Sequence, residues 1–109
     1  IIDFAREKDC VSIAAHPYRE YGMGDLARNY KFDAVEVLNG ASSPFANKKA
    51  HELAKQLGLP GVAGSDAHQP AELFNVHTEI QSCLDVDEVL KAIKKGLVAT
   101  YPKLRSIHL

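Results

Sequence analysis

Short apolar runs alternate with amphipathic segments along the chain, and this alternation predicts strands and helices in turn. Runs of small and branched apolar residues predict buried strands at 11–15, 34–38 and 61–65. Residues 76–80 alternate between apolar and polar side chains with a period of two, which predicts a fourth strand near a sheet edge. Residues 99–109 carry a weaker pattern that is compatible with one more short strand.

Two helices have clear start and stop signals. Ser43 is expected to cap the first helix, Pro44 suits its first turn, and Gly58 ends it. The second helix begins with a capping box, formed by Asp85 and the glutamate three residues later, and it ends at Gly96. Each helix carries an apolar stripe at helical spacing, which predicts that it packs on the strands.

The opening residues 1–9 also have helical spacing, and Asp25 is expected to cap a short helix over 26–30. No capping residue or entry turn precedes the opening stripe, so we expect the sequence to begin inside an element. The chain 1–109 is therefore predicted to be a single partial domain.

The alternation of strands and helices predicts an α/β fold, with parallel strands and flanking helices. In such sheets the functional side chains collect at the carboxyl ends of the strands, where the loops meet. Polar residues are found at these positions: His16 follows the first strand, Asn39 follows the second, and Asp66 and His68 follow the third. This arrangement predicts a site at the carboxyl edge of the sheet.

The composition agrees with an ordinary globular domain. Of 109 residues, 46% are hydrophobic and 25% are charged, and the formal net charge is −1, so there is no large field to attract nucleic acid or an anionic membrane. Cys10 and Cys83 lie far apart without CxxC spacing, which favours a reduced, cytoplasmic protein. No apolar run approaches the ~18 residues that a membrane span needs.

Histidine and aspartate after neighbouring strands indicate a metal site. In extended chain, Asp66 and His68 would point the same way about 6.6 Å apart, which suits ligands of two neighbouring ions. A carboxylate and a neutral imidazole favour zinc, manganese or iron over calcium. Because a proline follows it, His16 is expected to stay extended at the strand tip and to be a third ligand. The alternative is a turn in which Asp66 caps a local amide and His68 is merely exposed.

Three further residues are candidates near these ligands. Glu36 lies within an apolar strand, where an unpaired carboxylate is costly, so it is expected either to orient a metal ligand from behind or to pair with a lysine. Asn39 could contact substrate, or could simply make the turn with the next glycine. Arg19 could hold a phosphate with its fork of donors, or could be an exposed loop arginine. The other histidines have no companions at ligand spacing and are expected at the surface: His51, His77 and His108.

Three stretches resemble the polymerase-and-histidinol-phosphatase (PHP) superfamily: AHP at 15–17, DAVEVLNG at 33–40 and LGLPGVAGSDAH at 57–68. The resemblance runs from about residue 1 to residue 97 and is to the C-terminal half of the stand-alone phosphoesterase branch. It implies the C-terminal part of a distorted (β/α)7 barrel with a trinuclear centre of divalent zinc, manganese or iron. It also implies hydrolysis of phosphate esters by metal-activated water, with nucleotides, oligonucleotide ends or histidinol phosphate as substrates.

Residue by residue, the resemblance places His16 at the family's late His-Pro ligand, and Asp66 and His68 at its final Asp-x-His pair. The early His-x-His motif, further histidines and the bridging glutamate of the family are missing, and Glu36 comes too late in the order to be that glutamate. We therefore expect the chain to carry a minority of the ligands and to be inactive alone, with the N-terminal half of the barrel as its partner.

Two other functions stay open. One is a metal-dependent amidohydrolase, which builds a similar strand-end site. The other is a non-catalytic half-barrel interaction module, whose open sheet edge pairs with a missing domain or with a second copy.

Overall fold

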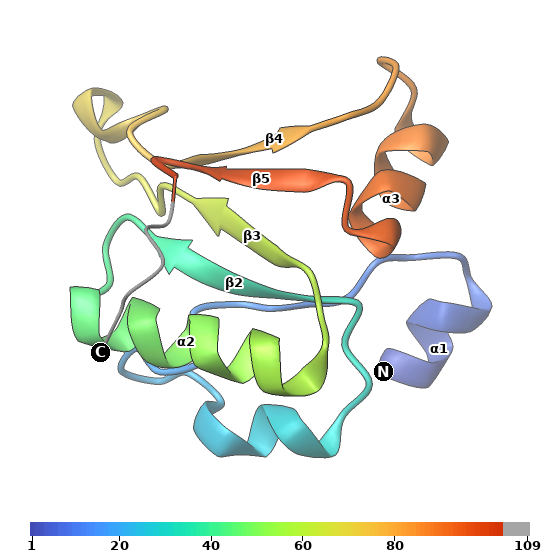
Figure 1. Ribbon diagram of the computed structural model, residues 1–109, viewed down its shortest axis with the longest axis horizontal. Helices are drawn as coiled ribbons and strands as arrows, with labels where there is room; N and C mark the ends of the chain where they lie inside the picture. The colour runs from blue at the N-terminus through green and yellow to red at the C-terminus, as the bar shows by residue number, and fades with distance from the viewer. Residues whose placement is uncertain (104–109) are drawn as a thin grey trace.

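Three parallel strands form the centre of the computed structural model, which describes residues 1–103 (Figure 1). The strands are β1 (Ile13–Ala14), β2 (Ala34–Asn39) and β3 (Gly61–Gly64), and they lie side by side in the order β1-β2-β3. β2 therefore has a neighbour on each side. The strand expected over 11–15 is shorter than predicted, and burial on both faces is wrong for it. The reason is that β1 lies at the sheet edge, where Ile13 stays 39% exposed.

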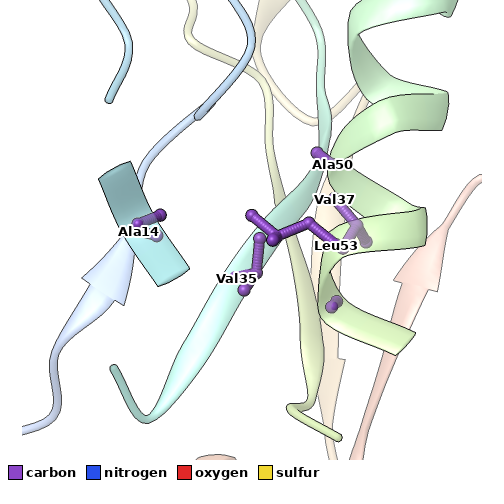
Figure 2. Close-up of a cluster of buried hydrophobic side chains, with 7 residues drawn as sticks. Ala14, Val35, Val37, Ala50 and Leu53 are labelled. Carbon is purple, nitrogen blue, oxygen red and sulfur yellow. The ribbon is translucent and has the colours of Figure 1, made fainter. Parts of the chain in front are cut away.

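Helix α2 (Pro44–Leu57) covers one face of the sheet, with the ends that the sequence predicts. The Ser43 hydroxyl accepts a hydrogen bond from the Ala46 amide at 3.1 Å, and Gly58 ends the helix with a left-handed φ of 67°. Leu53 packs between the helix and β2 (Figure 2). The buried cluster on this face consists of Ala14, Ala27, Val35, Val37, Ala50, Leu53 and Ala54.

A second cluster lies on the opposite face of β2, because successive side chains of a strand point to opposite sides. Ala34 and Val62 meet Ile93 of α3 (Val86–Lys95) there. The Asp85 carboxylate caps this helix by accepting a hydrogen bond from the Asp87 amide at 2.9 Å. The expected capping box is wrong in its second half, since the Glu88 carboxylate lies 3.4 Å from Lys91 instead.

The last two strands form an antiparallel pair, β4 (His77–Ile80) and β5 (Val98–Tyr101), which corrects the expectation of parallel strands throughout. Helix α3 lies at the end of this pair, and after it the chain returns along β5, antiparallel to β4 (Figure 1). The Thr78 hydroxyl joins the pair to β3, because it accepts from the Ala63 amide at 2.8 Å and donates to the Ala63 carbonyl at 2.7 Å. The strand expected in the tail is β5.

The N-terminal helical segments differ in part from expectation. Helix α1 (Ile2–Glu7) forms but buries no residue, and the segment after Met23 is a 3-10 helix, η1 (Gly24–Asn29). Asp25 does not cap it, because its carboxylate accepts a hydrogen bond from the Tyr18 hydroxyl at 2.6 Å.

The described residues thus form an α/β structure with an open parallel sheet and flanking helices, and its place in a barrel stays a prediction. No helix in residues 1–103 is both long and apolar enough to cross a membrane. His108, expected at the surface, lies outside the described residues.

Candidate metal-binding site

The loops that carry the candidate residues leave neighbouring strands at the same edge of the sheet. β2 and β3 run in the same direction (Figure 1), and Asn39 at the end of β2 pairs in register with Gly64 at the end of β3. Gly40 lies so close to the next turn that a Cβ atom there would be 2.5 Å from the Ser65 carbonyl oxygen. This close approach brings Asp66 beside the end of β2.

The Asp66 carboxylate contacts two polar side chains at this edge of the sheet. Its carboxylate forms an ion pair with Arg19 and accepts a hydrogen bond from Asn39 Nδ2 at 3.3 Å. The Asn39 hydrogen bond is the main cause that lowers the pKa of the Asp66 carboxyl below its ordinary value, although burial opposes it. Electrostatic interactions with Arg19, His68 and His16 lower this pKa further. The environment therefore keeps Asp66 ionised, as a metal ligand must be.

His68 is oriented by the main chain of Asp66. Its ring Nδ1 lies 2.8 Å from the Asp66 carbonyl oxygen, which can only accept, so Nδ1 carries the proton. In the neutral ring, Nε2 then has a free lone pair, and this is the usual orientation of a histidine that binds a metal. His68 is exposed, and its backbone amide donates a hydrogen bond to Glu72 Oε1 at 3.2 Å.

His16 offers a buried nitrogen without a partner. The ring Nδ1 is covered from solvent and makes no hydrogen bond with the described residues. The expectation of an extended backbone is wrong, since His16 has a φ of 24°. Two contacts hold this conformation: the His16 amide donates to Glu36 Oε1 at 2.9 Å, and Gly22 packs so close that a Cβ there would be 2.4 Å from the His16 carbonyl oxygen.

Glu36 connects two of the strand ends. Its Oε1 accepts hydrogen bonds from the His16 amide and from Asn39 Nδ2, both at 2.9 Å. Its Oε2 faces β3, where a Cβ on Gly64 would come within 2.9 Å. The carboxylate thus meets hydrogen-bond donors from the loop after β1 and from the end of β2, and no ion pair to a lysine occurs among residues 1–103. Its part in orienting a metal ligand stays a prediction.

Asn39 and Asn47 tie the end of β2 to α2. Asn39 is only 2% exposed, and its side chain bonds to Glu36, to Asp66 and to the Ala41 amide. Asn47 Oδ1 accepts from the Asn39 amide at 3.0 Å, and Asn47 Nδ2 donates to the Asn39 carbonyl at 3.1 Å. Asn47 is not among the site residues predicted from the sequence. The one available signal was a poor helix former in the first turn of a well-capped helix.

Two other histidines of the described residues, His51 and His77, lie apart from this edge and are half-buried rather than fully at the surface. His51 lies on α2, and the His77 ring stacks on Tyr101 at a centroid distance of 4.7 Å. His77 Nε2 lies 3.9 Å from Glu79 Oε1.

The donors are suited to a divalent metal but do not complete a site by themselves. The buried His16 nitrogen, the ionised Asp66 and the oriented His68 have the right chemistry for zinc, manganese or iron. Within the described part of the chain, however, no group of three or more His, Cys, Asp or Glu side chains is arranged to hold an ion. The Asp66 carboxylate instead forms an ion pair with Arg19. These residues therefore fit a metal as part of a larger ligand set.

The fold and these donors define an α/β protein with a candidate divalent-metal site at the carboxyl edge of its parallel strands. A family model described as PHP-associated matches residues 44–98, half of the chain. The chain belongs to this family, which confirms the resemblance to the C-terminal region of the PHP superfamily. The match includes Asp66 and His68 and begins after His16 and Asn39. No curated protein matches the chain.

Proposed function

We propose that the chain is the C-terminal part of a metal-dependent phosphoesterase that hydrolyses phosphate mono- or diesters. The observation that carries the proposal is the set of donors at the sheet edge: the Asp66 carboxylate, the Nε2 of His68 and the unpartnered Nδ1 of His16. Membership of the PHP-associated family favours this function over an amidohydrolase. The substrate is a small phosphate ester or the end of a nucleic acid.

His16, Asp66 and His68 are the proposed ligands in this chain, and a trinuclear centre would take its other ligands from the N-terminal half of a barrel. When bound, the metal supplies Lewis-acid polarisation of the phosphoryl group and lowers the pKa of water. The contribution of the chain is to hold the donors in place, since Glu36 fixes the His16 backbone and Asn39 fixes the Asp66 carboxylate. Without the other ligands, the chain is inactive and binds metal weakly.

Arg19 and Asn39 are the proposed contacts to the substrate. Arg19 is half-buried at the sheet edge, and its guanidinium already binds an anion, the Asp66 carboxylate. Metal binding by Asp66 would free this guanidinium for a phosphoryl oxygen, which it suits as a fork of donors. Asn39 uses its side-chain amide within the protein, so its contact with substrate would need at least one of these bonds to change.

Calorimetric titration with Zn²⁺ tests the ligand assignment. We expect weak binding by the 109-residue chain, a large loss of affinity in Asp66→Asn, and no turnover of p-nitrophenyl phosphate. Asp87→Asn is the matched control, because Asp87 is exposed on α3 and belongs to no candidate site. Equal affinity in both variants, or clear turnover by the wild-type chain alone, would overturn the proposal.

A second titration tests the phosphate contact. Inorganic phosphate should strengthen Zn²⁺ binding by the wild-type chain, because phosphate can bridge the metal and Arg19. Arg19→Gln should remove this effect while leaving binding of Zn²⁺ alone in place. Arg28→Gln is the control, since Arg28 pairs with Asp25 and Gln56 away from the sheet edge. An equal phosphate effect in wild type and Arg19→Gln would exclude Arg19 as the contact.

A further inference from the structure

The end of β2 lacks a neighbouring strand on one side. β1 ends at Ala14, which pairs with Val35, so β2 continues four residues beyond the last partner on that side. On the other side, Gly40 donates to the Gly64 carbonyl and keeps the ladder with β3 closed. Asn39 is 2% exposed, so leaving its amide without a partner would be costly. Its carbonyl accepts from the Ser42 amide at 3.2 Å.

The side chain of Asn47 takes the place of the missing strand. Its Oδ1 accepts from the Asn39 amide at 3.0 Å and its Nδ2 donates to the Asn39 carbonyl at 3.1 Å, so one side-chain amide makes the two bonds that two peptide groups of an adjacent strand would make. Asn47 is itself held in the first turns of α2, between the Ser43 cap and the buried Ala50. Aspartate would lose the donor, and glutamine would reach too far.

Once its backbone is fixed, the Asn39 side chain reaches both sides of the candidate site. Its Nδ2 donates to Glu36 Oε1 at 2.9 Å and to Asp66 Oδ2 at 3.3 Å. The same Glu36 oxygen accepts from the His16 amide. A chain of hydrogen bonds therefore runs from α2 through Asn47 and Asn39 to the loops that carry the proposed ligands.

We propose that Asn47 is a positioning residue for the metal site, acting through Asn39 on Asp66 and, by way of Glu36, on His16. The importance of Asn47 for catalysis depends on the function proposed above, whereas its hydrogen-bonded link through Asn39 to Asp66 does not. Outer residues that orient ligands typically change metal affinity about tenfold to a hundredfold when they are removed. Asn47 is expected to lie in this range although it touches no ligand.

The test compares Asn47→Ala with Ser43→Ala, which removes the side-chain cap of the same helix. The Ser43 carbonyl, which accepts from the Asn47 amide at 3.0 Å, is kept in this variant, and the Ser43 hydroxyl bonds to the Ala46 amide and to no side chain of this hydrogen-bond chain. In metal-free protein, nuclear Overhauser contacts between the Asn39 side-chain amide and Asp66 should be lost in Asn47→Ala and kept in Ser43→Ala. Zn²⁺ affinity should fall about tenfold or more in Asn47→Ala and stay unchanged in Ser43→Ala. Asn47→Asp, which keeps one of the two bonds, serves if the alanine variant does not fold, and its effect should be intermediate.

The outcomes separate the two proposals. If the wild-type chain binds no Zn²⁺, the proposed function fails, and the Overhauser contacts alone decide whether Asn47 positions Asn39 and Asp66. If Asn47→Ala keeps the contacts, or if Asn47→Ala and Ser43→Ala lose Zn²⁺ affinity equally, Asn47 is a structural residue of α2 and the positioning proposal is wrong.

Discussion

At the scale of single residues, the candidate site depends on polar side chains that hold one another. Glu36 illustrates this: one carboxylate oxygen satisfies both the His16 amide and the Asn39 side chain. Removing a buried acceptor leaves its donors unsatisfied, which costs more than the average hydrogen bond contributes. Glu36 therefore acts mainly as a hydrogen-bond acceptor. A neutral side chain with an oxygen in the same place could accept the same hydrogen bonds.

Two substitutions of Glu36 are expected to differ in their effect on stability. Glu36→Ala should lower the free energy of unfolding by about 1–3 kcal/mol, because two donors lose their partner. Glu36→Gln should lower it less, since its amide oxygen can still accept from both. Urea unfolding measures both values, and equal losses in the two variants would show that charge, rather than acceptance, is what matters at this position.

Single residues also show which features of the site could be predicted from the sequence and which could not. The strand-end positions of His16, Asp66 and His68 could be predicted, because parallel strands bring their carboxyl ends to one edge. The conformation of His16 could not, since it depends on Glu36 from the next strand and on the close packing of Gly22. Such contacts join residues that are distant in sequence and leave no local pattern.

At the scale of elements, α2 has two tasks: it covers the sheet and it supplies Asn47. Its boundaries could be predicted, because cap, proline and terminal glycine are local signals and all act as expected. The antiparallel β4 and β5 could not be predicted from strand–helix alternation, since α3 lies at the end of the pair instead of across the sheet (Figure 1). Alternation shows the order of elements and does not show the direction in which the chain returns.

The packing of α2 gives the second prediction. Leu53 is 1% exposed and lies in the cluster between α2 and β2 (Figure 2), so Leu53→Ala leaves a cavity. We expect a loss of about 2–5 kcal/mol in the free energy of unfolding, measured by urea denaturation. Leu84→Ala makes the same chemical change at a fully exposed site and should alter stability by less than about 0.5 kcal/mol. Similar losses in both variants would argue against this core.

At the scale of the whole molecule, the sheet is open at β1. Ile13 is 39% exposed there, and no strand among residues 1–103 pairs with the outer side of β1. Large apolar side chains nearby are also exposed, and a groove of about 750 Å³ is lined by Ile1, Ile2, Met23, Tyr30 and Phe32 among others. An unpaired edge next to apolar surface favours pairing with another chain segment.

The open edge yields a third prediction. The 109-residue chain should self-associate as its concentration rises, and Ile13→Lys should shift it toward monomer, because a lysine on an edge strand opposes pairing. Light scattering over a concentration series measures this. Lys48→Ile on α2 serves as a control for general surface hydrophobicity. A wild-type chain that stays monomeric throughout would contradict self-pairing at β1.

The most direct test of the central claim is to map where a metal binds. In a titration with Mn²⁺, a paramagnetic ion, the nuclear magnetic resonance signals nearest to the ion broaden first, even when binding is weak. The account predicts early broadening of signals from His16, Asp66 and His68 together, and its loss in Asp66→Asn. Broadening that begins at His77 and Glu79, or that persists unchanged in Asp66→Asn, would contradict a metal site at the carboxyl edge of the sheet.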